Sequence, residues 1–242
     1  FGNHQINRFL SGFIFLNKQF AMSKFEDLGD DHWMSSQKTP VKKEALALSD
    51  QEKVSKISFH FKKIMELLGL DLNDMSLSGT PNRVAKMYVN EVFSGLNPKN
   101  APKISLFPNN YRYTGMLVEK DIEVYSTCEH HFVPIIGKAH VAYIAKDNVI
   151  GLSKINRIVQ HYCKRPQVQE RLTIEITNEL KKVLGIEDVA CVIEAKHLCV
   201  NMRGVRDTKS VTITAKYSGA FNNEFQKKEF LSHINLDSNF DL

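Results

Sequence analysis

The order of strand-like and helix-like segments between residues 113 and 219 constrains the fold of this chain most. Residues 115–128 and 132–145 are rich in β-branched and aromatic residues, which are typical of strands. Residues 151–163 and 166–185 then repeat apolar side chains at helical spacing, and strand-like stretches return at 188–200 and 209–219. The order strand, strand, helix, helix, strand, strand predicts an α+β fold.

Two more helices are predicted before these strands, within residues 49–95. Ser49 followed by Glu52 has the sequence of a capping box, and apolar residues then recur at helical spacing. Thr80 is predicted to cap a second helix, which would end at Gly95. We therefore expect one domain over residues 48–221, with N-terminal helices in 49–95 and a sheet-containing core in 113–219.

Both ends of the chain are predicted to lie outside this domain. Residues 1–47 are polar and lack sustained periodicity, which favours a mobile N-terminal arm. The chain begins with Phe1, and we expect Met22 to be the true start, with upstream sequence before it. Residues 222–242 are predicted to form a polar C-terminal tail.

Composition limits the class of protein. The chain has 242 residues, of which 43% are hydrophobic, so it can bury a core in one or two domains. It contains no apolar run of eighteen residues, so no transmembrane helix is predicted. Four cysteines in a chain of this length favour reduced thiols and a cytoplasmic location. The net charge of +5 fits an anionic partner or a mildly basic surface.

Cysteines and histidines gather in two short segments. In the stretch STCEHHFVPIIG, Cys128 and His131 are three residues apart at the end of a predicted strand. In KHLCVNMR, His197 and Cys199 are two apart, so in an extended segment they share one side about 7 Å apart. Zinc binds Cys sulfur and His nitrogen, and catalytic sites use three protein ligands with one open position. These residues predict a Zn²⁺ site formed by Cys128, His131 and Cys199.

The two remaining histidines have a different predicted role. His130 and His197 lie beside the ligands, and imidazole is the natural proton donor and acceptor near neutral pH. A catalytic zinc site with these two acid/base residues is one interpretation. The alternative is a structural zinc site in which Cys163, at the end of a helix, supplies a fourth ligand.

Basic residues follow the two metal segments. Ser153 is predicted to cap a helix whose first turns carry Lys154 and Arg157, three residues apart. A helix N-terminus with adjacent cations binds phosphate, and Arg203 and Arg206 follow the second metal segment. The alternative is an ordinary capped helix with a solvated basic face.

Two further positions carry polar groups of the right kind for a purine nucleotide. Glu170, beside Gln169, could accept hydrogen bonds from the N1–H and the exocyclic amine of guanine. A helix N-terminal Glu is equally explained by the helix dipole. Arg83, in the first turn of the second helix, reads from sequence alone as a surface residue.

Several separated motifs in one order resemble the GTP cyclohydrolase I family. They are STCEHHFVPIIG, GLSKINRIV, QERLT and HLCVNMRGV, together with TPNRVAKMY and the closing YSGAF, and they span residues 49–221. The resemblance implies the T-fold, a ββααββ unit with an antiparallel sheet and two helices on one face. It also implies a homodecamer of two stacked pentamers with active sites at subunit interfaces.

The resemblance implies a reaction as well: GTP and water give 7,8-dihydroneopterin triphosphate and formate. This is the first step of pterin biosynthesis, toward tetrahydrofolate or tetrahydrobiopterin. GTP and water are the expected substrates, with neither nucleic acid nor membrane as a partner. The implied residues are the zinc ligands Cys128, His131 and Cys199; the acid/base pair His130 and His197; Ser153, Lys154, Arg157, Arg203 and a neighbouring subunit's Arg83 for the triphosphate; and Glu170 with Gln169 for guanine.

Three alternatives make different predictions. A T-fold nitrile reductase would use a cysteine nucleophile and NADPH without zinc, whereas the cysteines here occupy zinc-ligand positions. A non-catalytic zinc-containing subunit would bind metal without turnover. A nucleic-acid binder would alternate cations with stacking aromatic residues, whereas the cations here lie at the site segments.

Overall fold

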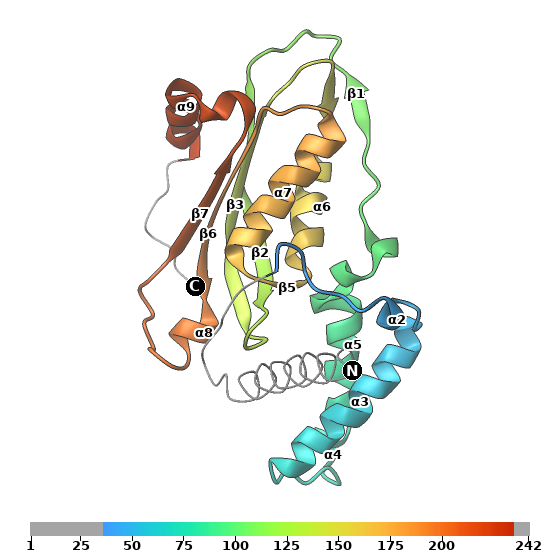
Figure 1. Cartoon of the computed structure of the whole chain (residues 1–242). Coiled ribbons are helices and arrows are strands. Elements are labelled where there is room, and N and C mark those ends of the chain that lie inside the picture. Colours follow the sequence, from blue (N-terminus) through green and yellow to red (C-terminus); the bar gives the residue numbers. More distant parts are fainter. Residues whose placement is uncertain (1–35, 235–242) are drawn as a thin grey trace, which may run out of the picture. The chain divides into compact units, whose positions relative to one another are not determined.

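A five-stranded sheet is the central element of the structure (Figure 1). The structure is a computed structural model, and it describes residues 36–234. The sheet belongs to a compact unit that begins at Gln37. The strand order is β5-β2-β3-β6-β7, antiparallel except for the short β5, which runs parallel to the end of β2. A separate pair, β1 and β4, is antiparallel. The strands are β1 (Leu106–Pro108), β2 (Met116–Cys128), β3 (Pro134–Ile144), β4 (Asn148–Ile150), β5 (Pro166–Gln167), β6 (Val189–His197) and β7 (Thr212–Tyr217).

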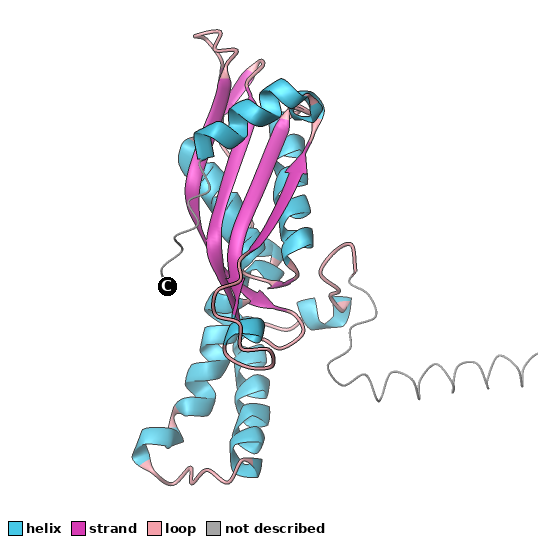
Figure 2. Cartoon of the chain, turned by 90° about the vertical axis from the view of Figure 1, so that its left-hand side faces the viewer, coloured by secondary structure: helices cyan, strands magenta, loops and turns pink. Residues whose placement is uncertain are grey.

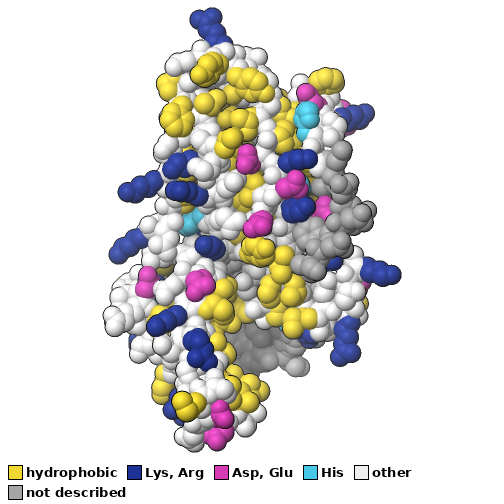
Figure 3. Space-filling model, turned by 180° about the vertical axis from the view of Figure 1, so that it is seen from behind, with side chains coloured by type: hydrophobic (Ala, Val, Ile, Leu, Met, Phe, Trp, Pro, Cys, Tyr) yellow, Lys and Arg dark blue, Asp and Glu magenta, His cyan; other side chains and the backbone are white. Residues whose placement is uncertain are grey.

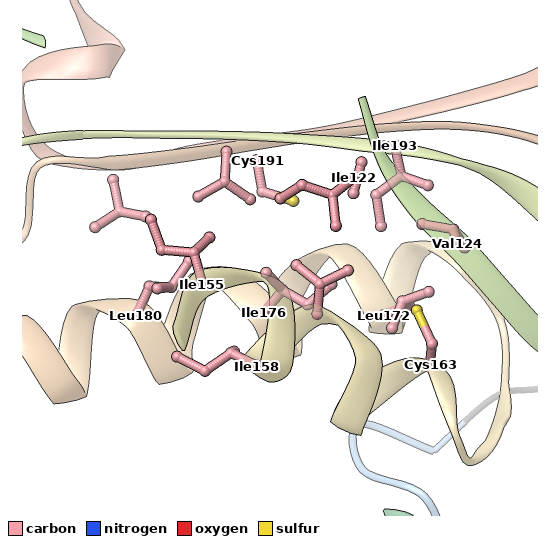
Figure 4. Close-up of a cluster of buried hydrophobic side chains, with 14 of the residues drawn as sticks. Ile122, Val124, Ile155, Ile158, Cys163, Leu172, Ile176, Leu180, Cys191 and Ile193 are labelled. Atoms are coloured by element: carbon pink, nitrogen blue, oxygen red, sulfur yellow. The ribbon is translucent and has the colours of Figure 1, made fainter. Parts of the chain in front are cut away.

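Two helices, α6 (Leu152–Cys163) and α7 (Gln169–Leu184), cover one face of this sheet (Figures 1 and 2). Successive strand residues point to opposite faces, so alternate residues of β2, β3 and β6 meet the helices. Each Ile or Leu side chain buried there contributes about 1.5–3 kcal/mol. The α+β prediction and the predicted order of strands and helices are confirmed. The main core includes Ile122, Val124, Ile155, Ile158, Leu172, Ile176, Leu180, Cys191 and Ile193 (Figure 4).

The other face of the sheet is covered in part by α9 (Glu224–Ile234). Phe230 and Ile234, one helical turn apart, are buried against Ala142 and Val192, and the Phe230 ring meets Phe221 edge to face. The description of residues 222–242 as a polar tail was therefore incomplete, because a helix with two buried side chains lies within it.

The N-terminal helix α3 (Asp50–Leu67) begins as predicted. Ser49 Oγ accepts a hydrogen bond from the Glu52 amide at 3.2 Å. The Glu52 carboxylate accepts in return from the Ser49 amide at 2.8 Å, which completes the capping box.

The second helix begins differently from the prediction. Gly79 is the N-cap of α5 (Thr80–Met87), so Thr80 is the first helical residue rather than the cap. The predicted continuation to Gly95 is irregular and passes through a π-helical turn, η1, and a 3₁₀ turn, η2. The bounds of these and the remaining elements are α2 (Lys43–Leu46), α4 (Met75–Ser78), η1 (Tyr88–Val92), η2 (Ser94–Leu96), η3 (Pro98–Asn100), α8 (Leu198–Asn201) and η4 (Gly219–Asn222).

Part of the predicted arm and tail lies outside the described residues. This applies to residues 1–35, with the expected start at Met22, and to residues 235–242. The described end of the arm contains the short helix α2, which the sequence did not predict. Within residues 36–234, no helix combines the length and apolar character needed to cross a membrane.

Candidate metal and nucleotide site

A tight turn between β2 and β3 carries the stretch CEHH. The Cys128 amide donates to the Val133 carbonyl at 2.9 Å, and the Phe132 amide donates to the Cys128 carbonyl at 2.9 Å. Phe132 has a φ of 54°, in the left-handed region that tight turns use. The turn therefore holds Cys128 at the buried end of the strand, with His131 half-buried beside it.

The second metal segment meets this turn because β3 and β6 are paired. Ile135, at the start of β3, lies opposite His197, at the end of β6, and α8 begins at the next residue and carries Cys199. One ligand atom each from Cys128, His131 and Cys199 lies within 4.8 Å of the other two. Two thiols and one imidazole at this separation fit a transition-metal ion such as zinc with one open position.

The electrostatics of the two thiols agree with a cation site. Burial, and then the neighbouring Cys128 thiol, raise the pKa of Cys199. Two adjacent thiolates are unfavourable without a compensating charge, and a divalent cation supplies that charge. The residues present therefore fit a metal ion.

Cys163 does not join this group. It lies in the main core beside Leu172 and Val124, and burial raises the pKa of its thiol to about 12 (Figure 4). Among the described residues, the group that could hold a metal contains Cys128, His131 and Cys199 and not Cys163. The alternative of a structural site with Cys163 as fourth ligand was therefore wrong, because this thiol faces the helix–sheet core.

His197 lies next to the ligands, where the Gln169 side chain orients it. The Gln169 amide nitrogen donates to the carbonyls of Ile193 at 3.0 Å and Thr212 at 2.9 Å. Its oxygen lies 2.8 Å from His197 Nε2 and can only accept, so His197 donates from Nε2 and keeps Nδ1 as an acceptor. Burial lowers the pKa of His197, although the nearby Glu170 charge opposes this, so burial favours the neutral imidazole.

His130 and Arg203 complete this side of the site. Nδ1 of His130 is 3.8 Å from the Cys128 sulfur, and its Nε2 is 3.8 Å from a carboxylate oxygen of Glu129. Arg203 Nη1 donates to His131 Nε2 at 2.9 Å, since a guanidinium can only donate. A cation predicted to contact phosphate therefore lies at the metal ligands.

The phosphate residues on α6 are not brought to these ligands. The Ser126 hydroxyl donates to the Cys163 carbonyl at 2.8 Å, so the last turn of α6 is at the metal end of β2. Ser153 lies ten residues earlier, about 15 Å along the helix. Arg157 lines a separate cavity of about 420 Å³ with His161 and other polar residues. Within one copy of the chain, Lys154 and Arg157 therefore lie away from the metal group.

The N-cap of α6 differs from the prediction, and Arg83 lies at the surface. Gly151, with an extended backbone, is the N-cap of α6, so the prediction that Ser153 caps this helix was wrong. Arg83 is exposed on α5 and donates to Thr80 Oγ1 at 2.8 Å and to the Ser76 carbonyl at 3.1 Å. Like Lys154, it lies on an element other than those that carry the metal ligands.

An ion pair beside the site was not predicted from the sequence. The Arg171 guanidinium, on α7, is buried and contacts the Glu129 carboxylate in the CEHH turn. An acidic residue directly between two site residues was the available signal, but its partner is 42 positions away in sequence. Local spacing cannot reveal such a pair.

The chain is similar in sequence to known proteins over most of its length. The sequence profile of the GTP cyclohydrolase I family matches residues 57–235. "GTP cyclohydrolase 1" of Flavobacterium johnsoniae is 58% identical over 215 residues, which cover 89% of this chain and 96% of that protein. The proteins of the same name from Aeromonas salmonicida and Yersinia enterocolitica are 54% and 51% identical, over 78% and 81% of this chain and 88% and 89% of theirs. The chain therefore belongs to the GTP cyclohydrolase I family.

Proposed function

We propose that this chain converts GTP and water into 7,8-dihydroneopterin triphosphate and formate, with zinc held by Cys128, His131 and Cys199. The observation that carries the proposal is the convergence of these three ligand atoms within 4.8 Å. The relatives named GTP cyclohydrolase 1 support the reaction. When bound, zinc supplies Lewis acidity that activates water at this position.

The reaction consists of two hydrolyses and a ring closure. Water adds at C8 of guanine, the imidazole ring opens, and a second hydrolysis releases C8 as formate. The ribose then opens, rearranges to a ketone and condenses with the free amine, which releases one water. The net stoichiometry is one GTP and one water for one formate and one dihydroneopterin triphosphate.

The residues of the site have separate roles in this proposal. His197, neutral and with Nδ1 as an acceptor, exchanges protons with the purine nitrogens. His130, at the exposed side of the turn, moves protons to and from the ribose ring oxygen. Glu170, with Gln169 beside it, binds guanine, and its carboxylate accepts from the N1–H and the amine. The Gln169 side chain also keeps His197 in one tautomer.

A complete site in this proposal needs several copies of the chain. The five-stranded sheet leaves both edges available: within residues 36–234, β5 pairs only with Thr127 and Cys128 of β2, and β7 pairs only with β6. Such edges add a strand from another chain. Hydrophobic side chains are visible on the surface seen from behind, in larger groups at the end opposite α4 and in smaller groups at the α4 end (Figure 3). Large apolar side chains also remain exposed on the helices near α4. These side chains include Leu67, Leu68 and Met75.

We propose that five copies join their sheet edges into a ring and that two rings stack into a decamer. Ser153, Lys154 and Arg157 of one copy, with Arg83 of another, then bind the triphosphate of the GTP held at a neighbour's metal group. Arg203, which lies at that metal group, binds the same triphosphate. This arrangement accounts for the separation of α6's first turn from Cys128 within one copy.

Mixing two inactive variants tests the shared site. Cys199→Ser and Lys154→Ala are each expected to be nearly inactive, because one lacks a metal ligand and the other a phosphate contact. The two variants are unfolded together and refolded in equal amounts, and the mixture is expected to regain about a quarter of the wild-type activity. Half of the copies have an intact Cys199 and the other half an intact Lys154, and an active site needs one copy of each kind in the right positions.

A mixture of Cys199→Ser with Cys128→Ser is the control and is expected to stay inactive, because both changes damage the same part. A Cys199→Ser and Lys154→Ala mixture that stays equally inactive, despite forming mixed assemblies, would contradict a site built from separate copies.

A further inference from the structure

The buried guanidinium of Arg171 donates hydrogen bonds to the CEHH turn and to the residues that support it. Arg171 is 3% exposed and lies in the first turn of α7. Its Nε donates to Gln167 Oε1 at 2.9 Å, and Nη2 donates to the Pro166 carbonyl at 3.0 Å and to the Glu129 carboxylate. A buried guanidinium without such partners would be strongly destabilising, so this pairing fixes the side chain in one place.

Glu129 is held from both sides. Its backbone amide donates to the Gln167 carbonyl at 3.0 Å, and one carboxylate oxygen faces Arg171. The other oxygen is 3.8 Å from Nε2 of His130, whose Nδ1 is 3.8 Å from the Cys128 sulfur. The carboxylate thus lies between a buried arginine and a histidine that contacts a metal ligand.

The support for Arg171 is itself rigid. The amide nitrogen of Gln167 donates to the Tyr162 carbonyl at 3.1 Å and to the Glu175 carboxylate at 2.8 Å, so its oxygen must face Arg171. Arg165 lies 3.7 Å from the same Glu175 carboxylate. A fully paired network of this kind holds one arrangement of its members.

We propose that Arg171 is a positioning residue: through Glu129 it fixes the CEHH turn so that His130 faces the substrate while Cys128 and His131 face the metal. This inference rests on the proposed function. Arg171 touches neither substrate nor metal in this account; it acts only through Glu129. A planar, bidentate guanidinium is suited to this task, whereas lysine offers a single point charge.

The test compares Arg171→Met and Arg171→Lys with a matched control on the same helix. Lys182→Met removes a pair with Glu179 on the solvent side of α7, where Lys182 is 76% exposed. Arg171→Met is expected to lower kcat about 10- to 100-fold, as loss of residues that support metal ligands does, with metal still bound. KM for GTP is expected to change by less than about threefold, because GTP contacts are untouched. Arg171→Lys is expected to recover part of the loss, and Lys182→Met to match the wild type.

A double variant tests whether Arg171 acts through Glu129. If it does, Arg171→Met combined with Glu129→Gln loses no more kcat than the worse of the two single variants. Losses that multiply, or a wild-type kcat in Arg171→Met, would overturn the inference. If Arg171→Met does not fold, the same comparison of kcat is made with Arg171→Lys, Glu129→Gln and their double variant, in which each side chain keeps nearly the same volume.

A second readout needs neither metal nor turnover, so it separates this inference from the proposed function. Diethyl pyrocarbonate modifies exposed imidazoles, and mass spectrometry of metal-free protein gives the rate at His130. Arg171→Met and Glu129→Gln are expected to increase that rate several-fold while the rate at His233, on α9, stays constant. Unchanged His130 rates would overturn the positioning role, whereas a wild type that releases no formate from GTP would overturn only the proposed function.

Discussion

The Cys199→Ser variant is expected to retain less than about a tenth of the wild-type metal and to release no measurable formate from GTP. The three ligand atoms converge within 4.8 Å, so loss of one leaves only a thiol and an imidazole. A serine hydroxyl stays protonated at neutral pH and is a poor zinc ligand. Metal content is measured by atomic emission on protein purified without chelator, and formate is measured with GTP in excess.

Cys163→Ala is the matched control, because Cys163 is a buried thiol in the core and outside the metal group. It is expected to keep wild-type metal content at some loss of stability, since a small cavity is left behind. Full metal content in Cys199→Ser would contradict the ligand assignment, and metal loss in Cys163→Ala would reopen the structural four-ligand site.

The His130→Ala variant is expected to keep about one metal ion per chain and to lose kcat by about 10²- to 10⁴-fold, the usual contribution of a general acid or base. His130 is not part of the ligand group, and its ring faces Glu129 and Cys128 from the exposed side of the turn. Steady-state kinetics and metal content are measured on the same preparation. Because Arg171 acts through Glu129 on the turn that carries this histidine, the loss in Arg171→Met is expected to fall at or below the lower end of this range.

His233→Ala, an exposed histidine on α9, is the control and is expected to keep wild-type kinetics. Retention of most activity in His130→Ala would remove this residue from the acid/base pair. Loss of metal in the same variant would instead make it a ligand, which the geometry does not predict.

Local sequence patterns predicted the parts of the fold that depend on local interactions. The capping box of Ser49 and Glu52 and the order of strands and helices follow from hydrogen-bonding groups and periodicity within a few residues. The ligand group was also within reach, because Cys128 and His131 are in one turn and the pairing of β3 with β6 places Cys199 beside it.

Features that depend on tertiary contacts were beyond these patterns. The distance of Ser153 from Cys128 is set by the direction of α6 across the sheet, which spacing does not encode. The pair of Arg171 with Glu129 joins residues 42 positions apart. The burial of Phe230 on α9 was concealed by the polar residues around it, since only two apolar side chains of that helix are fully covered.

Incubation of the zinc-loaded, full-length protein with GTP is the most direct test of the central claim. Formate is quantified enzymatically, and the second product is identified by its mass and by its fluorescence after oxidation. Formate and 7,8-dihydroneopterin triphosphate in equal amounts, lost on chelation and restored by zinc, are the predicted result. Zinc and GTP both bound without any release of formate would contradict it.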